Sequence, residues 1–400
     1  MSWLIQNFGL VLLSGMAGMS GYVYNLIVTN VWDASFLSQI LGLIGVFSLF
    51  ILPASLVILP AARWSIQTPG WQRKSRPIQI VFLSAGTILA VAMYLTRSLW
   101  EHLVFIPDGW FMPLLLWIVP SYLLSFNTGL LMGQRAYWSM GFVSAIPQIG
   151  RPLLLAIALL LGMSGSPMVA LWVLVAAVWL GTVYGSVRIA QLHHRQESAV
   201  SLPVSLGATG MSSLVVNIWL TWDIAVAYLV LEPEQMAVYS IVSSLGKMPF
   251  YLASHVANMG INESAVKGIK VFKVNFLILL IGIVCSLGAV ICGDFLMGMF
   301  KVSTDISVFI WYLIANTVLA MVYFIIGIEA QSGRHMWIST GVCAAVWTAY
   351  SLARKPDLNE LIIALFVALL LSLVLTIALV RGVQRLDVIR LLKNKQDVKQ

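Results

Sequence analysis

Long apolar runs recur along the whole chain, separated by short polar segments or by segments with proline and glycine. A helix that crosses a membrane needs about 20 mostly apolar residues. The runs are continuous rather than alternating, which predicts helices and not the strands of a membrane barrel. Twelve spans are predicted, at residues 6–30, 34–62, 77–97, 110–132, 136–163, 167–190, 203–231, 236–259, 270–299, 305–331, 335–352 and 359–381.

Composition agrees with this pattern. Of the 400 residues, 60% are hydrophobic and only 10% are charged, and the mean hydropathy is +0.94. Soluble domains carry about 25% charged residues, so this chain has too few charges to cover a surface that faces water. The sequence therefore predicts an all-α polytopic membrane protein with about 12 transmembrane helices and no separate soluble domain.

The basic residues indicate an orientation. With a cytoplasmic N-terminus, 17 of the 23 Lys and Arg fall on the cytoplasmic side, four fall outside, and Arg151 and Lys247 lie within spans. An excess of Lys and Arg is typical of the cytoplasmic loops of membrane proteins. It explains the net charge of +8 without a nucleic-acid partner. We expect a multi-pass protein of the cytoplasmic (inner) membrane with both termini in the cytoplasm.

An even number of spans suggests two halves, because transporters are often built from repeats. The predicted units are an N-terminal six-helix bundle at residues 1–195, a C-terminal six-helix bundle at 196–381 and a basic tail at 382–400, with a central cavity between the bundles. The tail has apolar residues at helical spacing between basic ones, which indicates either an amphipathic helix on the anionic leaflet or a frayed basic end. The first apolar run is expected to be a retained helix rather than a signal peptide.

Ionisable residues deep in spans are the strongest candidates for function, because an isolated charge in a bilayer is costly. Arg151 and Lys247 lie mid-span beside prolines, and Asp223 lies in the outer half of its span. One interpretation is a cationic cavity for a phosphate or pyrophosphate head group. The alternative is a buried ion pair in which Asp223 balances one cation. Asp223 is also a candidate for coupling to an ion or a proton.

Uncharged polar residues lie on the same predicted helices. Asn25, Asn127, Gln148 and Asn217 are candidates for lining the translocation cavity, and hydrogen bonding between helices is the alternative for each. The same alternatives apply to two further polar residues, Asn316 and His255. Gly15, Gly18 and Gly21 recur about once per turn, which favours close helix packing.

Catalytic and cofactor motifs are absent from the sequence. It contains no P-loop, no H-E-x-x-H, no zinc-ligand spacing and no nucleophile elbow. The three cysteines lie singly within apolar runs and form no C-x-x-C pair. We therefore expect no cofactor, no metal centre and no enzyme activity.

The segment after the central loop carries a family resemblance. Asn217 and Asp223 precede an outer turn, Leu231-Glu232-Pro233-Glu234, and a helix that contains Tyr239-Ser240. This arrangement resembles the second half of polysaccharide flippases of the multidrug/oligosaccharidyl-lipid/polysaccharide (MOP) superfamily. Asn25 and the turn at Val31-Trp32-Asp33-Ala34 resemble the opening hairpin of the same family. Unlike some flippases of lipid-linked precursors, the first span has no Arg or Lys.

The resemblance implies two six-helix bundles that form a V around a cavity and export lipid-linked oligosaccharides by alternating access. The leading hypothesis is therefore a flippase for a polyprenyl-pyrophosphate-linked oligosaccharide, with membrane lipids and other polysaccharide-assembly proteins as partners. A multidrug or metabolite exporter of the same fold is the first alternative. A membrane glycan polymerase or ligase is the second, with Glu101, His102 and Asp108 of the outer loop as its acid and base candidates.

Overall fold

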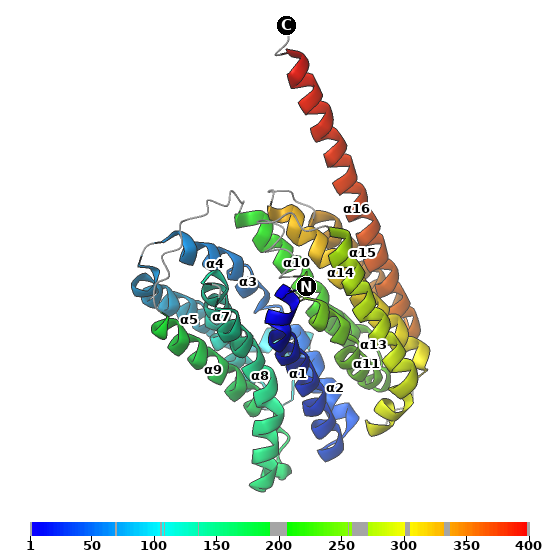
Figure 1. The fold of residues 1–400 in the computed structure, drawn as a ribbon. Helices are drawn as coiled ribbons and strands as arrows, with labels where there is room; N and C mark the ends of the chain where they lie inside the picture. Colours follow the sequence, from blue (N-terminus) through cyan, green and yellow to red (C-terminus); the bar gives the residue numbers. More distant parts are fainter. Residues whose placement is uncertain are drawn as a thin grey trace.

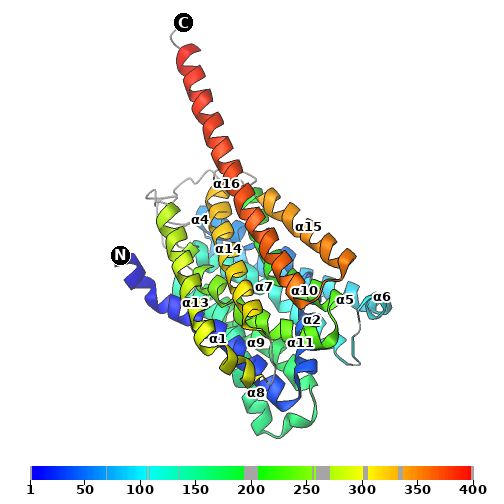
Figure 2. The same cartoon turned by 90° about the vertical axis from the view of Figure 1, so that its right-hand side faces the viewer.

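The computed structural model describes residues 2–68, 70–104, 106–107, 109–134, 136–192, 206–254, 256–257, 271–300, 305–331 and 337–397. These residues form helices and contain no strand. The helices run side by side in one body (Figures 1 and 2). They are α1 (Ser2–Val31), α2 (Ala34–Ser48), α3 (Leu52–Ser55), α4 (Ile58–Gln67), α5 (Trp71–Leu95), α6 (Arg97–Leu103), α7 (Phe111–Gly133), α8 (Tyr137–Leu160), η1 (Met163–Gly165), α9 (Met168–Gln191), α10 (Leu206–Val230), α11 (Pro233–Gly246), α13 (Val271–Met299), α14 (Ile306–Gln331), α15 (Trp337–Arg354) and α16 (Leu358–Asp397).

Within the described residues, seven helices are long and apolar enough to cross a membrane, or eight if a bent pair counts as one span. The seven are α5, α7, α8, α9, α13, α14 and α16. Their side chains that face away from the body are largely apolar, as in a protein whose surroundings are lipid. The prediction of a helical, multi-pass membrane protein is confirmed at this level.

The bent pair replaces the single span predicted at 34–62. Asp33 caps the start of α2, because its carboxylate accepts the backbone N–H of Phe36 at 2.6 Å. After Ser48 the backbone makes tighter turns, and the axis bends by 58° before α3 and α4 continue. Pro53 lies at the start of α3 and lacks the N–H that an unbroken helix needs at that position.

Helices that are close in the sequence mostly pack together, and α1 and α2 are the exception. Helices α5, α7, α8 and α9 pack on one another on one side of the molecule, and α10, α13, α14, α15 and α16 gather on the other side (Figure 1). Helices α1 and α2 connect the two groups, because α1 packs against both α8 and α11, and α2 packs against α10 and α11. The N-terminal hairpin therefore contacts residues from both parts of the chain.

Glycine allows the closest helix crossings, although not at the glycines that the sequence favoured. Gly129 and Gly133 of α7 face the backbone of α4 so closely that a Cβ would overlap it. By contrast, a Cβ at Gly18 would meet no atom of the described residues within 4 Å, and those at Gly15 and Gly21 would make only ordinary contacts with them. Among the described residues no neighbouring helix approaches these glycines closely, which contradicts the prediction of close packing along this face of α1.

The C-terminal tail continues the last span. Helix α16 passes Gly382 without a break, reaches Asp397, and projects well beyond the other helices (Figures 1 and 2). The tail is therefore helical as far as Asp397. Its contact with a lipid leaflet stays a prediction.

Candidate functional site

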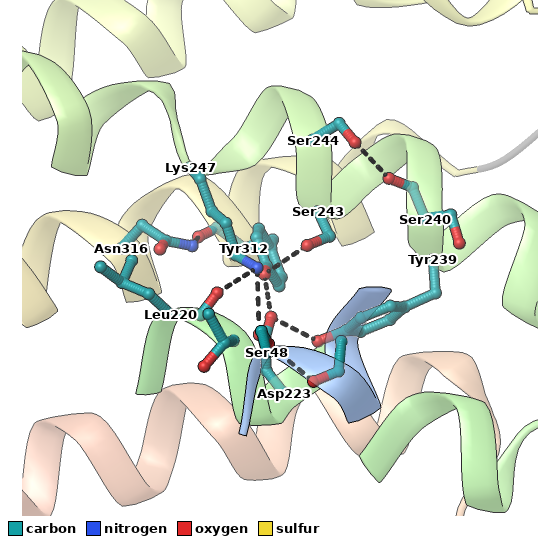
Figure 3. Close-up of polar contacts among 12 residues, drawn as sticks. Ser48, Leu220, Asp223, Tyr239, Ser240, Ser243, Ser244, Lys247, Tyr312 and Asn316 are labelled. Atoms are coloured by element: carbon teal, nitrogen blue, oxygen red, sulfur yellow. Dashed lines mark hydrogen bonds and ion pairs between the residues drawn. The ribbon is translucent and has the colours of Figure 1, made fainter. Parts of the chain in front are cut away.

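Asp223 and Lys247 form a buried ion pair between α10 and the end of α11. Lys247 Nζ lies 3.0 Å from Asp223 Oδ1 and also donates to the backbone carbonyl of Leu220 at 2.8 Å (Figure 3). The exposed fraction is 1% for Asp223 and 4% for Lys247. Of the alternatives that the sequence leaves open for Asp223, an ion pair with Lys247 is present in this structure.

Two tyrosine hydroxyls complete the surroundings of the carboxylate. Tyr239 of α11 donates to Asp223 Oδ2 at 3.0 Å, and Tyr312 of α14 donates to the same oxygen. Ser243 Oγ lies 3.0 Å from the Tyr312 hydroxyl oxygen. The side chains point toward one another from three helices (Figure 3). We call Asp223, Tyr239, Ser243, Lys247 and Tyr312 the ion-pair cluster.

Local sequence explains how these groups meet. Helix α11 ends at Gly246, and Lys247 occupies the C-cap position two residues before Pro249. Proline cannot donate a helical hydrogen bond, so the chain turns here and the lysine is directed from the helix end. Gly246 packs so closely on the Tyr312 ring that a Cβ would overlap it. Glycine at this position therefore permits the approach of α11 to α14.

Arg151 has a different environment. It lies in the middle of α8, between Gln148 and Pro152, and its side chain is half-buried. Its Nε is buried and has no hydrogen-bond partner among the described residues. Its guanidinium lies within electrostatic range of two phenol groups, those of Tyr24 on α1 and of Tyr251, four residues beyond Lys247. Neither neighbour is an acid, so no described carboxylate forms an ion pair with Arg151.

The residues around Arg151 come from both parts of the chain. Tyr24 is buried and donates to the Ala170 carbonyl of α9, whereas Tyr251 is 42% exposed. Gln148 lies one turn before Arg151, and its Oε1 would be 4.0 Å from a Cβ at Gly21. We call Tyr24, Gln148, Arg151 and Tyr251 the arginine site.

The predicted cavity asparagines lie in separate places. Asn25 is buried and donates to Ser244 Oγ of α11 at 2.6 Å, which connects the two parts of the chain. Asn127 is fully buried in the N-terminal part, where its amide accepts from Gln79 at 2.9 Å and donates to Ser186 at 3.0 Å. Asn217 is half-buried on α10, one turn from Leu220. The structure therefore does not gather the predicted residues into a single cluster.

Two further polar candidates complete the comparison with the sequence. Asn316 is buried beside the ion-pair cluster and donates to the Tyr312 carbonyl of its own helix at 3.0 Å. His255 lies outside the described residues.

Sequence reasoning missed the tyrosines of both sites. Buried tyrosine hydroxyls usually have a hydrogen-bond partner, so Tyr24 and Tyr312 within apolar runs carried a signal. That signal does not name the partner. Tyr239 and Asp223 are 16 residues apart and meet only because α10 and α11 pack against each other.

The described residues contain no group of three or more His, Cys, Asp or Glu side chains able to hold a metal ion. The three cysteines are free thiols on α13 and α15. The polar chemistry of the two sites therefore consists of one ion pair, tyrosine hydroxyls, amides and an arginine.

Comparisons with known proteins identify the fold. No protein-family model and no curated protein sequence matches the chain. A solved structure of the lipid II flippase MurJ in an inward closed conformation matches with a TM-score of 0.66 and 10% identity, over 92% of this chain and 87% of MurJ. The MATE multidrug transporter DinF-BH matches at 0.58 and 13% identity, over 94% of each chain. An inward-facing multidrug resistance MATE family transporter of the MOP superfamily matches at 0.56 and 14% identity, over 94% of this chain and 95% of that one.

These solved structures are transporters and a flippase rather than enzymes, and each is covered over most of its length. The resemblance that the sequence indicates is thus confirmed at the level of the fold. The chain is a multi-pass membrane protein with the fold of these MATE transporters and of MurJ.

Proposed function

We propose that this protein is a flippase that moves a lipid-linked oligosaccharide with a pyrophosphate head group across the cytoplasmic membrane, with Arg151 as the principal contact to the phosphates. The head group enters from the cytoplasmic leaflet, while the polyprenyl tail stays in the lipid. Relative movement of the two halves then exposes the head group to the outside.

The observation that supports this proposal most directly is the guanidinium of Arg151, which has no carboxylate partner among the described residues. Arginine stays protonated in proteins, and the Arg151 guanidinium is half-buried without an acid to balance its charge. Natural chains retain such a group where a ligand supplies the missing charge. A phosphate fits, because its oxygens accept the parallel N–H donors of a guanidinium. Tyr24, Gln148 and Tyr251 add polar groups for the head group and the first sugars.

The ion-pair cluster adds no second cation to this site. Lys247 is neutralised by Asp223. Of the two cations predicted for the cavity, Arg151 alone is then available to bind phosphate. The Asn127 amide accepts one hydrogen bond and donates two within the N-terminal part, and we assign it a role in packing α7 against α5 and α9.

The alternatives rest on weaker observations. Multidrug export by the same fold is favoured by the likeness to MATE transporters. A cationic drug, however, would have to bind beside Arg151 with no free acid near it among the described residues. The polymerase or ligase alternative relied on the outer loop, where Glu101 pairs with Arg97 on the surface and His102 and Asp108 have no described side chain.

We further propose twelve spans in two bundles, 1–195 and 196–381. To the seven long helices and the bent pair, this proposal adds α1, α10, α11 with the helical stretch 248–254, and α15. Residues 193–205, where the two halves would join, lie outside the described residues. In Figure 1, α10 begins and α16 leaves the body at the same end, which fits cytoplasmic positions for both.

The test measures export of the lipid-linked precursor by Arg151 variants, in a strain that depends on this protein. We expect Arg151→Ala to cause at least a tenfold accumulation of the lipid-linked precursor on the cytoplasmic side, with normal amounts of protein in the membrane. Arg151→Lys should retain part of the activity, because a lysine keeps the charge without the fork of donors. Arg188→Ala is the matched control, since Arg188 already bonds Ser139 and Gln191.

Full export by Arg151→Ala would end the assignment of Arg151. Dye efflux from vesicles without any change in lipid-linked sugars would favour the multidrug alternative.

A further inference from the structure

The ammonium group of Lys247 lies in a position lined by oxygen atoms. Its Nζ is 3.0 Å from Asp223 Oδ1 and 2.8 Å from the Leu220 carbonyl oxygen. Lys247 is the only cation within ion-pair distance of Asp223 among the described residues. Carboxylate and carbonyl oxygens are also the ligands that hard metal cations take in proteins.

The rest of the cluster fixes these oxygens in place. Tyr239 and Tyr312 donate to Asp223 Oδ2 from two other positions, which directs Oδ1 toward the ammonium. The Leu220 carbonyl belongs to α10, one turn before Asp223 on the same helix. The position therefore keeps its negative carboxylate and its carbonyl whether or not the lysine side chain is present.

The charge of the position favours a monovalent ion. Lys247 supplies one positive charge to a single carboxylate, and one carboxylate balances only one positive charge. A potassium ion, which accepts carbonyl oxygens in place of its water shell, suits such a position better than a divalent ion does.

We propose that Lys247 is a covalently attached cation that occupies a potential alkali-cation site, so that the wild-type protein needs no sodium or potassium ion there. Truncation of the lysine opens this site and makes the protein dependent on an alkali cation. The alternative is that Asp223 and Lys247 form a structural ion pair and nothing more. In that case no small cation would restore the stability that is lost when Lys247 is truncated. The inference bears on the driving force of the proposed transport, but its first test does not depend on that function.

The experiment measures thermal unfolding of the full-length protein in detergent, in sodium chloride, potassium chloride and N-methyl-D-glucamine chloride at equal ionic strength. We expect Lys247→Ala to be much less stable than wild type in N-methyl-D-glucamine. Its unfolding midpoint should rise by several degrees in a saturable way with potassium or sodium. Wild type should unfold at the same temperature in all three salts.

Two variants serve as controls. Lys247→Met removes the charge but fills the space with a chain of similar length, so it should show no alkali-cation effect. Asp223→Asn combined with Lys247→Ala removes the carboxylate, and with it the cation effect.

Equal instability of Lys247→Ala in all three salts would overturn the proposal. So would its failure to fold in any salt while the double variant folds, and so would a specific stabilisation of wild type by sodium or potassium. If neither truncated variant folds in any of the salts, no alkali cation replaces the lysine, and the proposal fails.

A transport assay then separates the two proposals. Under the proposed function, wild-type flipping continues without alkali cations, and Lys247→Ala flips only in their presence. Absence of any flipping by wild type, with the unfolding results intact, contradicts the proposed function and leaves the alkali-cation site standing.

Discussion

Arg151 and Lys247 look alike in the sequence and differ in the folded protein. Both are single cations near the middle of an apolar run, and both lie within two residues of a proline. In the structure, Lys247 is 4% exposed and reaches Asp223, whereas Arg151 is half-buried and its Nε has no described partner. The difference between them is the presence of an acid on a neighbouring helix.

This contrast divides the polar interior into two regions with different surroundings. The ion-pair cluster joins α10, α11 and α14, all from the C-terminal part of the chain. It therefore holds that part together and can move with it as a unit. The arginine site takes side chains from α1, α8 and the stretch after α11, so its surroundings change if the two parts move relative to each other.

The largest effect on stability is expected at Asp223. Asp223→Ala leaves the Lys247 ammonium buried with only the Leu220 carbonyl as partner, which should cost about 3–5 kcal/mol. Unfolding of the purified protein in detergent measures the loss. Asp223→Leu combined with Lys247→Met should recover more than half of it, because the double change leaves no buried charge. A double variant no more stable than Asp223→Ala would contradict this account of the pair.

The tyrosines of the same cluster should have the next largest effect. Tyr312→Phe removes the hydroxyl that contacts both Asp223 and Ser243, and should destabilise the protein by about 1–3 kcal/mol. Tyr239→Phe is the matched variant and should cost less, because of the two hydroxyls on Asp223 it is that of Tyr312 that also bonds Ser243. The reverse order would mean that Asp223 Oδ2 depends mainly on Tyr239.

A smaller effect is expected where the two parts of the chain meet. Asn25→Ala removes the bond from α1 to Ser244 of α11 and should cost about 0.6 kcal/mol, with about 1.7 as an upper bound. Thr29→Val is the matched control, since the Thr29 hydroxyl bonds only within its own helix. Thermal unfolding of both variants makes the comparison. An equal or larger loss for Thr29→Val would show that the contact between the parts does not stabilise this conformation.

The smallest effect on stability is expected at Arg151, although its effect on export is the largest. Arg151→Met removes a half-buried charge and breaks no ion pair with a described acid, so it should lower the free energy of unfolding by no more than about 0.5 kcal/mol. Lys247→Met, which strips the partner from a buried carboxylate, should be several times more costly. If Arg151→Met were as damaging as Lys247→Met, the distinction between the two sites would fail.

The sequence predicted the elements of the fold well because each one depends on local chemistry. Apolar runs of sufficient length must be helical in lipid, and the predicted segments at 110–132 and 305–331 coincide closely with α7 and α14. The bend in the predicted span 34–62 could not be predicted in this way. A proline alone does not predict a bend, because Pro113, Pro120 and Pro152 lie in helices that continue past them. The bend depends on how the turns around Pro53 are arranged.

The candidate site was predicted in part. Arg151, Lys247 and Asp223 were found because a charge in an apolar run is conspicuous whatever the fold. Their tyrosine partners were not found, because Tyr239, Tyr312 and Tyr251 are amphipathic, and such residues are common near helix ends. The glycines of α1 were misread because periodic spacing places residues on one face but does not say what lies opposite that face.

The sequence by itself determined that this chain lies in a membrane, that it is helical, and that three charged groups must be accommodated inside it. Hydrophobicity and the energy of burying a charge act on each segment separately, so no knowledge of the fold was needed. Only the tertiary structure decided that Asp223 neutralises Lys247 and leaves Arg151 without a described acid partner. An ion pair requires atoms about 3 Å apart, and the packing of α10, α11 and α14 sets that distance rather than their separation along the chain.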